Sequence, residues 1–556
     1  AQGTPGAAPA VDPMAARVDS LFRGVTGTGT PGCAVGVARG GQPVLARAYG
    51  MAELEHGAPN TPETIFEAGS VTKQVTAAAV VLLALDGRLS LDDDVRRHVP
   101  ELPDYARGHG TGITLRHLLT HTSGLRDWGT VAEMGGWPRG TRAYTNAIAL
   151  DIARRQGALN YAPGTFYSYT NTGYVLLAIV VERVAGVPLA EFTQTRLFAP
   201  LGMTRTGWRD DFRRVVRGRA VAYTPAGRGG FRLDMPFEDA HGNGGLLTTV
   251  GDLLRWTANL ERGAVGGPRF VEEMHRRGRL VDGRTLTYAS GLVLAPWRGV
   301  AEVGHSGATA GYRAYLSRYP DHGVTTAVLC NAGHANATAL ARGVAALFLG
   351  GAVARAPAIA VGDTTAGAAA GGAGALAALA GTYRSARDGR AVTIAARDGR
   401  LRWAERLPLV PVAPGRLALG EEDTVSVEGE GEGGAAASLV LRAPDGDTVR
   451  YERVPAWTPS AAELAAFAGA YHSDEAESTL TAAVEGGELV LRDRYGRRQA
   501  AARPLYRDTF GGERTLWRFA RDGAGRVVAL RVGEGRAWDV RFERVGARPG
   551  VAGRGS

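Results

Sequence analysis

A serine and a lysine stand three residues apart near the start of the chain. In the stretch EAGSVTKQVTA, residues 67–77, Ser70 and Lys73 are predicted to share one face of a helix. A serine needs a neighbouring base to become a nucleophile, and a desolvated lysine can serve as that base. The alternative for the same spacing is a serine that caps a helix beside a solvated lysine.

The composition of the chain favours a special role for Lys73. It is the only lysine in 556 residues, so the other 63 Lys and Arg residues are all arginines. Arginine keeps its proton at any ordinary pH, whereas burial or a neighbouring cation can deprotonate lysine. A position that keeps lysine in so arginine-rich a chain is a candidate for proton transfer.

Two later stretches carry further candidates. In YAPGTFYSYTNTGYVLLAIVVERVAG, residues 161–186, Tyr169 and Asn171 lie on a loop that leads into a predicted helix. A phenol beside a lysinium can act as a base, and an amide can orient a substrate carbonyl. Tyr167 is the rival base in this stretch, and packing is the alternative role for both tyrosines.

The third stretch is EVGHSGATAGYRAYL, residues 302–316. We expect His305-Ser306-Gly307 to end a strand, where Gly307 lets a backbone approach a ligand closely. The N–H group of Ala308 could then help to bind an oxyanion. The alternative is an ordinary strand end.

Alternating and helical patterns predict the elements that must position these residues. Strands at both ends of the first 350 residues, with helices between them, favour a sheet built from distant parts of the chain and packed against helices. The predicted strands are two within 33–50 around Gly40-Gly41, then 301–305, 312–319 and 324–331, and the predicted helices are 71–86, 114–120, 171–184 and 250–259.

The C-terminal part reads differently. Residues 351–375 are rich in Ala, Gly and Thr and are predicted to be a linker. Beyond it, LAGTYRS at 379–385 matches FAGAYHS at 467–473, and VRYERV at 449–454 matches VRFERV at 540–545. Two repeats of short strands predict two small antiparallel β-barrels in tandem, with a short helix at 460–467.

Composition excludes several other classes of protein. With 45% hydrophobic and 21% charged residues the chain reads as globular, and its longest mostly apolar stretch, residues 75–85, is too short to span a membrane. The net charge of +9 comes from scattered arginines, which favour a solvated basic surface over a nucleic-acid site. Two cysteines, Cys33 and Cys330, are too few for a disulfide scaffold or a four-cysteine metal site.

Together the motifs resemble the penicillin-recognising serine hydrolases of the class C β-lactamase type, which include DD-peptidases, D-aminopeptidases and family VIII esterases. The resemblance is close over residues 20–345. Its phrases here are FEAGSVTK from Phe66, TLRHLLTHTSGL from Thr114, PGTFYSYTNTGYVLL from Pro163, PLGMTRT from Pro200 and GGLLTT from Gly244.

The resemblance implies a role for each candidate residue. Ser70 would be the acylated nucleophile, Lys73 and Tyr169 would share proton transfer, and Asn171 would contact the substrate amide. The N–H groups of Ser70 and Ala308 would form the oxyanion hole beside His305 and Gly307. His117 and His121 are expected to be structural, and His241 and Asn243 are candidates to face the cleft.

One departure from the family pattern concerns the substrate. The β-lactamases of this type usually have Lys-Thr-Gly where this chain has His305-Ser306-Gly307. Histidine at that position resembles DD-peptidases, D-aminopeptidases and some esterases. Neutral imidazole binds a carboxylate less strongly than lysine does, so efficient β-lactam turnover is not expected.

The resemblance implies an α+β fold: a β-lactamase-like antiparallel sheet flanked by helices, with a helical subdomain. We predict a catalytic domain at 14–350, a linker at 351–375 and barrels at 376–455 and 460–547, as in D-aminopeptidases. The barrels either reshape the cleft or assist dimerisation or wall attachment. The first and last strands of such a sheet lie close together, so Cys33 and Cys330 form a disulfide or two buried thiols.

The sequence therefore predicts a serine hydrolase without metal or cofactor that cleaves amides or esters in small molecules or short peptides containing D-amino acids. The alternatives are a family VIII-type carboxylesterase with weak β-lactamase activity, and a penicillin or peptidoglycan sensor without turnover. We expect an exported protein, because residues 1–10 are mostly small residues typical of a mature N-terminus, with a flexible tether as the alternative. Neither a nucleic-acid partner nor a membrane span is expected, and a homodimer is an alternative to a monomer.

Overall fold

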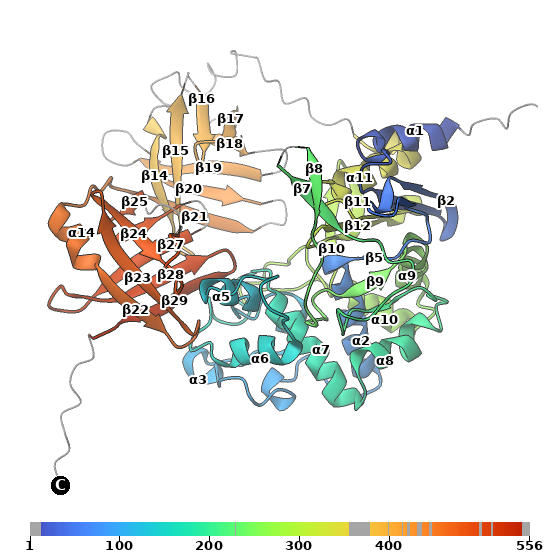
Figure 1. The fold of residues 1–556 in the computed structure, drawn as a ribbon, viewed down its shortest axis with the longest axis horizontal. Coiled ribbons are helices and arrows are strands. Elements are labelled where there is room, and N and C mark those ends of the chain that lie inside the picture. Colours follow the sequence, from blue (N-terminus) through green and yellow to red (C-terminus); the bar gives the residue numbers. More distant parts are fainter. Residues whose placement is uncertain are drawn as a thin grey trace, which may run out of the picture.

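A helix-flanked sheet and two β-sheet structures make up the chain in a computed structural model (Figure 1). The structure describes residues 13–227, 229–354, 378–397, 400–413, 415–419, 423–430, 436–443, 447–499, 503–512 and 515–546. Most of the predicted linker lies outside these ranges, so the predicted domain boundaries stay predictions. In the described part, no helix is both long and apolar enough to cross a membrane.

The first part is built on a six-stranded antiparallel sheet with the order β10-β11-β12-β13-β1-β2. Its first strand therefore pairs with its last, as predicted. The six strands are β1 Cys33–Arg39, β2 Gln42–Tyr49, β10 Val293–Trp297, β11 Val300–Thr309, β12 Tyr312–Tyr319 and β13 Val324–Cys330. In the register between β1 and β13, Cys33 faces Cys330, and the two sulfur atoms form a disulfide.

Helices cover both faces of this sheet because the residues of its central strands alternate between two apolar clusters. Val35, Val37 and Val328 pack with the N-terminal helix and the helix after β13, whereas Ala34, Ala327 and Leu329 belong to the larger cluster on the opposite face. The helices of this part are α1 Pro13–Leu21, α2 Lys73–Leu85, α3 Ala106–His109, α4 Leu115–Leu119, α5 Trp128–Met134, α6 Asn146–Arg154, α7 Asn171–Ala185, α8 Leu189–Thr193, α9 Val250–Arg262, α10 Gly267–His275 and α11 Ala337–Leu349.

Short elements connect these helices and strands. The short strands are β3 Met51–Glu53, β4 Ala58–Pro59, β5 Phe66–Glu67, β6 Gly207–Trp208, β7 Tyr223–Ala226, β8 Gly230–Leu233 and β9 Leu246–Thr248. The short helical turns are η1 Arg23–Val25, η2 Gly69–Thr72, η3 Val95–Arg97, η4 Gln194–Phe198, η5 Pro320–His322 and η6 Gly350–Ala352. Strand β5 precedes η2 directly and pairs with β9, which holds the start of the serine–lysine segment against the rest of the fold.

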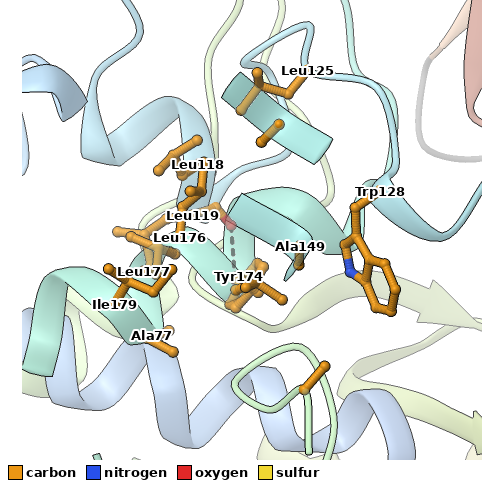
Figure 2. Close-up of a cluster of buried hydrophobic side chains, with 14 of the residues drawn as sticks. Ala77, Leu118, Leu119, Leu125, Trp128, Ala149, Tyr174, Leu176, Leu177 and Ile179 are labelled. Carbon is orange, nitrogen blue, oxygen red and sulfur yellow. Dashed lines mark hydrogen bonds between the residues drawn. The ribbon is translucent and has the colours of Figure 1, made fainter. Parts of the chain in front are cut away.

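The core beside α2 is a packed layer of helices, because residues 73–83 of this mostly apolar helix are all buried. Figure 2 shows Ala77 of α2 near Leu177 and Tyr174 of α7, with Leu118 and Leu119 beside them. The hydroxyl group of Tyr174 donates to the carbonyl of Leu119 at 2.8 Å. This contact satisfies the one polar atom of a fully buried tyrosine, so α4 and α7 are fixed relative to each other.

Two local predictions were wrong. The helix expected from residue 71 begins only at Lys73, because η2 forms a 3₁₀ turn after the positive φ of 52° at Gly69. The triplet His305-Ser306-Gly307 does not end its strand, because β11 continues through Thr309 in register with β12.

The C-terminal part contains two eight-stranded antiparallel sheets, as the repeats predicted. The first is a closed barrel of β14 Gly381–Ser385, β15 Ala391–Arg397, β16 Arg400–Trp403, β17 Leu407–Ala413, β18 Arg416–Leu419, β19 Asp423–Glu430, β20 Ala436–Arg442 and β21 Thr448–Val454. The second is a curled sheet of β22 Gly469–Ser473, β23 Ser478–Glu485, β24 Glu488–Arg492, β25 Arg503–Tyr506, β26 Thr509–Gly511, β27 Thr515–Arg521, β28 Val527–Glu534 and β29 Ala537–Arg544.

The repeated phrases occupy equivalent places in the two sheets. Each pair of phrases supplies the first and last strands, which lie side by side: β14 pairs with β21, and β22 pairs with β29. Helix α14, Ala461–Phe467, precedes the second sheet and starts with a capping box between Ser460 and Glu463. In Figure 1 the second sheet, drawn in red, lies beside α5.

Candidate active site

The predicted site residues meet at one cavity of about 610 Å³. It is bounded by η2, by the start of α7 and the loop before it, by the C-terminal half of β11 and by the loop before β9. The predicted residues that line it are Ser70, Tyr169, Asn171, His305, Gly307 and Ala308. Lys73 lies beneath Ser70 and is fully buried.

The amine of Lys73 has three partners. Its Nζ atom lies 3.2 Å from Ser70 Oγ, 3.0 Å from Asn171 Oδ1 and 2.7 Å from the carbonyl oxygen of Asn243. The amide oxygen and the carbonyl oxygen can only accept hydrogen bonds. A neutral amine therefore uses its two N–H bonds on them and has its lone pair left for the proton of Ser70.

The surroundings of Lys73 favour this neutral form. Burial, the foremost cause, lowers the pKa of Lys73 well below its ordinary value, and the nearby cation of Arg536 lowers it further. The carboxylate of Asp127 opposes them. However, both oxygens of Asp127 already accept backbone N–H groups, one of them from Asn171 at 2.7 Å.

Tyr169 lies against the same amine. The Nζ atom of Lys73 is 4.8 Å from the centre of the Tyr169 ring. Burial raises the pKa of Tyr169, and the hydroxyl group of Ser70 partly counteracts this. Because burial disfavours the phenolate and the ammonium alike, Lys73 is the better base at neutral pH, and Tyr169 stays a phenol.

His121 supports the loop that carries Tyr169. Its ring centre lies 4.2 Å from that of Tyr169, and its Nδ1 atom accepts from the backbone N–H of Thr170 at 3.2 Å. Burial lowers the pKa of His121 well below its usual value, so the ring is neutral. These contacts agree with the structural role expected for His121.

Two glycines bring β11 directly onto η2. A Cβ atom at Gly69 would lie 2.6 Å from the backbone nitrogen of Ala308, and one at Gly307 would collide with the carbonyl oxygen of Ala68. Gly307 therefore approaches the protein's own backbone closely, and because it also lines the cavity, its close approach to a ligand stays a prediction. It brings Ala308 next to the turn that carries Ser70, as an oxyanion hole made of their two N–H groups requires.

The His305 ring is held as a neutral imidazole. Its Nδ1 atom lies 2.6 Å from the carbonyl oxygen of Ser306, which only accepts, so Nδ1 carries the proton and Nε2 accepts from Tyr288 Oη at 3.0 Å. Burial, the foremost cause, lowers the pKa of His305 to about 4. Both ring nitrogens are occupied, so this histidine offers a substrate no positive charge.

Of the other candidates from the sequence, one lines the cavity and three do not. Asn243 lines the cavity and its carbonyl binds Lys73, whereas His241 does not line it and lies 3.4 Å from Glu182 instead. His117 belongs to the capping box of α4 with Thr114. Tyr167, the rival to Tyr169, is absent from the cavity wall.

Sequence reasoning missed three arginines in the cavity wall: Arg139, Arg313 and Arg536. Arg536 comes from the turn between β28 and β29 of the second C-terminal sheet, 466 residues after Ser70. No local motif marks it, because it is one of the many arginines of the chain and reaches the site only through the packing of the two parts. Tyr288, the partner of His305, was also missed.

Comparison with known proteins identifies the fold family. The Beta-lactamase family pattern matches residues 18–350, which is more than half of the chain. The chain belongs to the beta-lactamase family. The resemblance predicted from the motifs is confirmed, as are the serine hydrolase class and the α+β fold followed by two β-sheet structures.

Relatives within the family agree on this placement. The chain is 31% identical over 318 residues to a penicillin-binding protein of Bacillus subtilis (strain 168), an alignment that covers 53% of this chain and 66%, just under two thirds, of that protein. It is 27% identical over 488 residues to a D-aminopeptidase of Cereibacter sphaeroides (strain KD131), covering 86% of this chain and 85% of that enzyme.

Among solved structures, an octameric penicillin-binding protein homologue from Pyrococcus abyssi matches with a TM-score of 0.55 and 26% identity. The match covers 79% of this chain and 98% of the homologue.

Proposed function

We propose that this beta-lactamase family member is a serine acyl hydrolase that forms a covalent acyl-enzyme on Ser70. Its substrates are amides or esters of short peptides that contain D-amino acids. The observation that carries the proposal is the buried amine of Lys73, which lies 3.2 Å from Ser70 Oγ and has only acceptors as its other two partners.

The first half of the reaction follows from these contacts. Neutral Lys73 takes the proton of Ser70 as Oγ attacks the scissile carbonyl carbon. The N–H groups of Ser70 and Ala308 stabilise the oxyanion, and Asn171 contacts the substrate amide. The proton then passes from Lys73, with the phenol of Tyr169 beside it, to the leaving nitrogen or oxygen.

In the second half, water attacks the acyl ester and Lys73 accepts its proton. The free acid leaves, and Ser70 recovers its hydrogen. Overall, one amide or ester bond is hydrolysed by one water molecule, which gives an acid and an amine or alcohol. Every proton in this scheme travels between groups that line the cavity or lie directly beneath it.

The D-amino-acid substrate class rests on the relatives. One of them is named D-aminopeptidase and aligns with 86% of this chain, which is more than the family pattern alone covers. Another is named penicillin-binding protein. The neutral His305 agrees with slow turnover of β-lactams, since the usual lysine cation is missing at that position.

Hydrolysis of chromogenic substrates tests this function. We expect the Ser70→Ala variant to lose the hydrolysis of D-alanine p-nitroanilide and of short p-nitrophenyl esters that the wild-type protein shows. Cleavage of esters without any D-amide would favour a carboxylesterase, and stable acylation by a fluorescent penicillin without turnover would favour a sensor. If the wild-type protein leaves all of these compounds unchanged, the proposal fails.

Export and assembly complete the proposal. The Cys33–Cys330 disulfide supports an oxidising compartment, because cytosolic thiols are normally kept reduced. Appearance of the protein in the periplasmic or culture fraction of its host tests export. The homodimer stays a prediction, and light scattering on the purified protein tests it.

A further inference from the structure

The charged side chains that line the cavity in the described part of the chain are all positive. Among the described residues that line it there are three arginines and no aspartate or glutamate. A substrate held by its N-terminal ammonium needs a carboxylate partner, whereas a substrate held by its C-terminal carboxylate needs a cation. The wall of this cavity is therefore suited to a free carboxylate.

The three arginines differ in what they already bind. Arg139 is ion-paired with Glu238, its Nε atom lying 2.9 Å from a carboxylate oxygen. Arg313 donates to the carbonyl oxygens of Ala310 and Tyr312, both at 2.7 Å. Within the described ranges, the guanidinium of Arg536 has neither a hydrogen-bond acceptor nor an ion-pair partner, and Arg536 is exposed. Its donors are free to bind a substrate.

The backbone of Arg536 is held by hydrogen bonds, although no described residue accepts one from its guanidinium group. Its carbonyl oxygen accepts from the N–H of Asp127 at 3.3 Å and from Nδ2 of Asn160 at 3.1 Å. Nearby, Arg126 donates to the carbonyl of Trp538 at 2.9 Å and is ion-paired with Glu475. The turn between β28 and β29 is thus attached to Asp127, which also accepts from the N–H of Asn171, and Figure 1 shows the second sheet beside α5.

The location of Arg536 indicates that it would contact the leaving group of the substrate. Its guanidinium carbon lies 4.6 Å from the centre of the Tyr169 ring, and the Lys73 amine lies 4.8 Å from the same ring centre. These two residues deliver the proton to the leaving nitrogen in the proposed reaction. In an amino acid the carboxylate carbon is only two bonds from that nitrogen, so a cation that binds this carboxylate has to lie close to the proton donors.

We infer that Arg536 binds the free carboxylate of an amino acid leaving group, which makes the protein a carboxypeptidase for D-amino-acid peptides. This inference rests on the function proposed above. Ser70 attacks the last peptide carbonyl, the C–N bond breaks, and the proton taken from Ser70 moves to the nitrogen of the departing amino acid. Water then releases the shortened peptide, so one peptide bond and one water give two products.

Three matched substrates test the inference: N-acetyl-D-alanyl-D-alanine with a free carboxylate, the same dipeptide as its C-terminal amide, and D-alanine p-nitroanilide with a free amine. Because a hydrogen bond to a charged group is strong, we expect wild-type kcat/KM to be about 10- to 100-fold higher for the free acid than for its amide. Arg536→Met should abolish this preference, and Arg536→Glu should reverse it.

Two arginine variants serve as controls. Arg526, in the turn between β27 and β28 of the second C-terminal sheet, is paired with Asp522 and lies outside the cavity wall, so Arg526→Met should keep the wild-type preference. Arg313→Met removes the rival cation of the wall and should also keep the preference. Melting temperatures and circular dichroism of all variants show whether each one is folded, and Arg536→Gln replaces Arg536→Met if the latter is not.

The outcomes separate this inference from the proposed function. If Ser70-dependent hydrolysis occurs but the amide or the p-nitroanilide is the preferred substrate, Arg536 is not a carboxylate anchor. Survival of the preference in Arg536→Met, or its loss in Arg313→Met alone, also overturns the inference. If hydrolysis does not depend on Ser70, the proposed function itself fails.

Discussion

The Nζ atom of Lys73 lies 3.2 Å from the Oγ atom of Ser70, and no part of the lysine side chain reaches solvent. A buried lysine with no carboxylate within hydrogen-bond distance in the described chain is costly as a cation. Deprotonation removes this cost and produces a base beside the serine hydroxyl. The burial of the only lysine of the chain thus supplies the base that the proposed reaction needs.

Replacing this lysine should remove activity without removing the fold. Lys73→Met keeps the length of the side chain and suits an apolar environment, so we expect a near-wild-type melting temperature and a loss of kcat/KM of about 100- to 10,000-fold, as for other general bases. Lys73→Arg should be equally inactive, because guanidinium stays protonated. Wild-type activity in folded Lys73→Met would contradict the role of the amine.

The pH dependence of kcat/KM should follow the protonation of the Lys73 amine. Protonation of the amine at low pH removes the base, so activity rises with pH through the pKa of Lys73, and this pKa lies well below the ordinary value. Arg536→Met removes a cation that lowers this pKa, so the acidic limb should move to higher pH. Asp127→Asn removes an anion that raises it and keeps a capping side chain, so the limb should move to lower pH.

The same pH series contains its own control. Arg526→Met changes the net charge equally but lies outside the cavity wall, and its acidic limb should coincide with that of the wild-type protein. An acidic limb that does not move in either Arg536→Met or Asp127→Asn would show that another group limits the reaction.

Close packing between Gly69 and Ala308 should be essential for acylation. In Gly69→Ala the new Cβ atom would lie 2.6 Å from the backbone nitrogen of Ala308, at a φ of 52° that disfavours alanine. We expect β11 to move from the serine turn and kcat to fall about 100-fold or more, as when an oxyanion donor is lost. Gly207→Ala, where the Cβ atom meets nothing within 4 Å, should behave as wild type in the same assay.

The Cys33–Cys330 disulfide should stabilise the protein without taking part in the reaction. It lies in the apolar cluster with α11, on the sheet face opposite α2. A Cys33→Ala/Cys330→Ala double variant should lose about 2–4 kcal/mol of stability, seen as a lower melting temperature, and keep its kcat/KM. Titration of the unreduced, denatured wild-type protein should find no free thiol; two thiols would show that the bond is absent from the isolated protein.

The sequence was most informative where local chemistry decides the structure. The pattern around Gly40-Gly41 predicted β1 and β2, and the repeated phrases predicted two C-terminal structures of short antiparallel strands. The helix start predicted at residue 71 was wrong, because the turn before Lys73 depends on the packing of Gly69 against β11, a contact between residues far apart in the chain.

The site residues also divide into those that local motifs predicted and those that depend on packing between distant parts of the chain. Ser70, Tyr169 and His305 were found from short motifs, and all three line one cavity. Arg536 could not be found this way, because its place depends on how the second C-terminal sheet packs beside α5. Nor could the neutral state of His305 be predicted, since it depends on Tyr288 and on burial.

Covalent labelling of Ser70 tests the central claim most directly. A fluorophosphonate that reacts with activated serines should add one label to each wild-type chain, on the peptide that contains Ser70. Ser70→Ala and Lys73→Met should remain unlabelled under the same conditions. A label on a different serine, or full labelling of folded Lys73→Met, would contradict the account of a serine activated by a buried lysine.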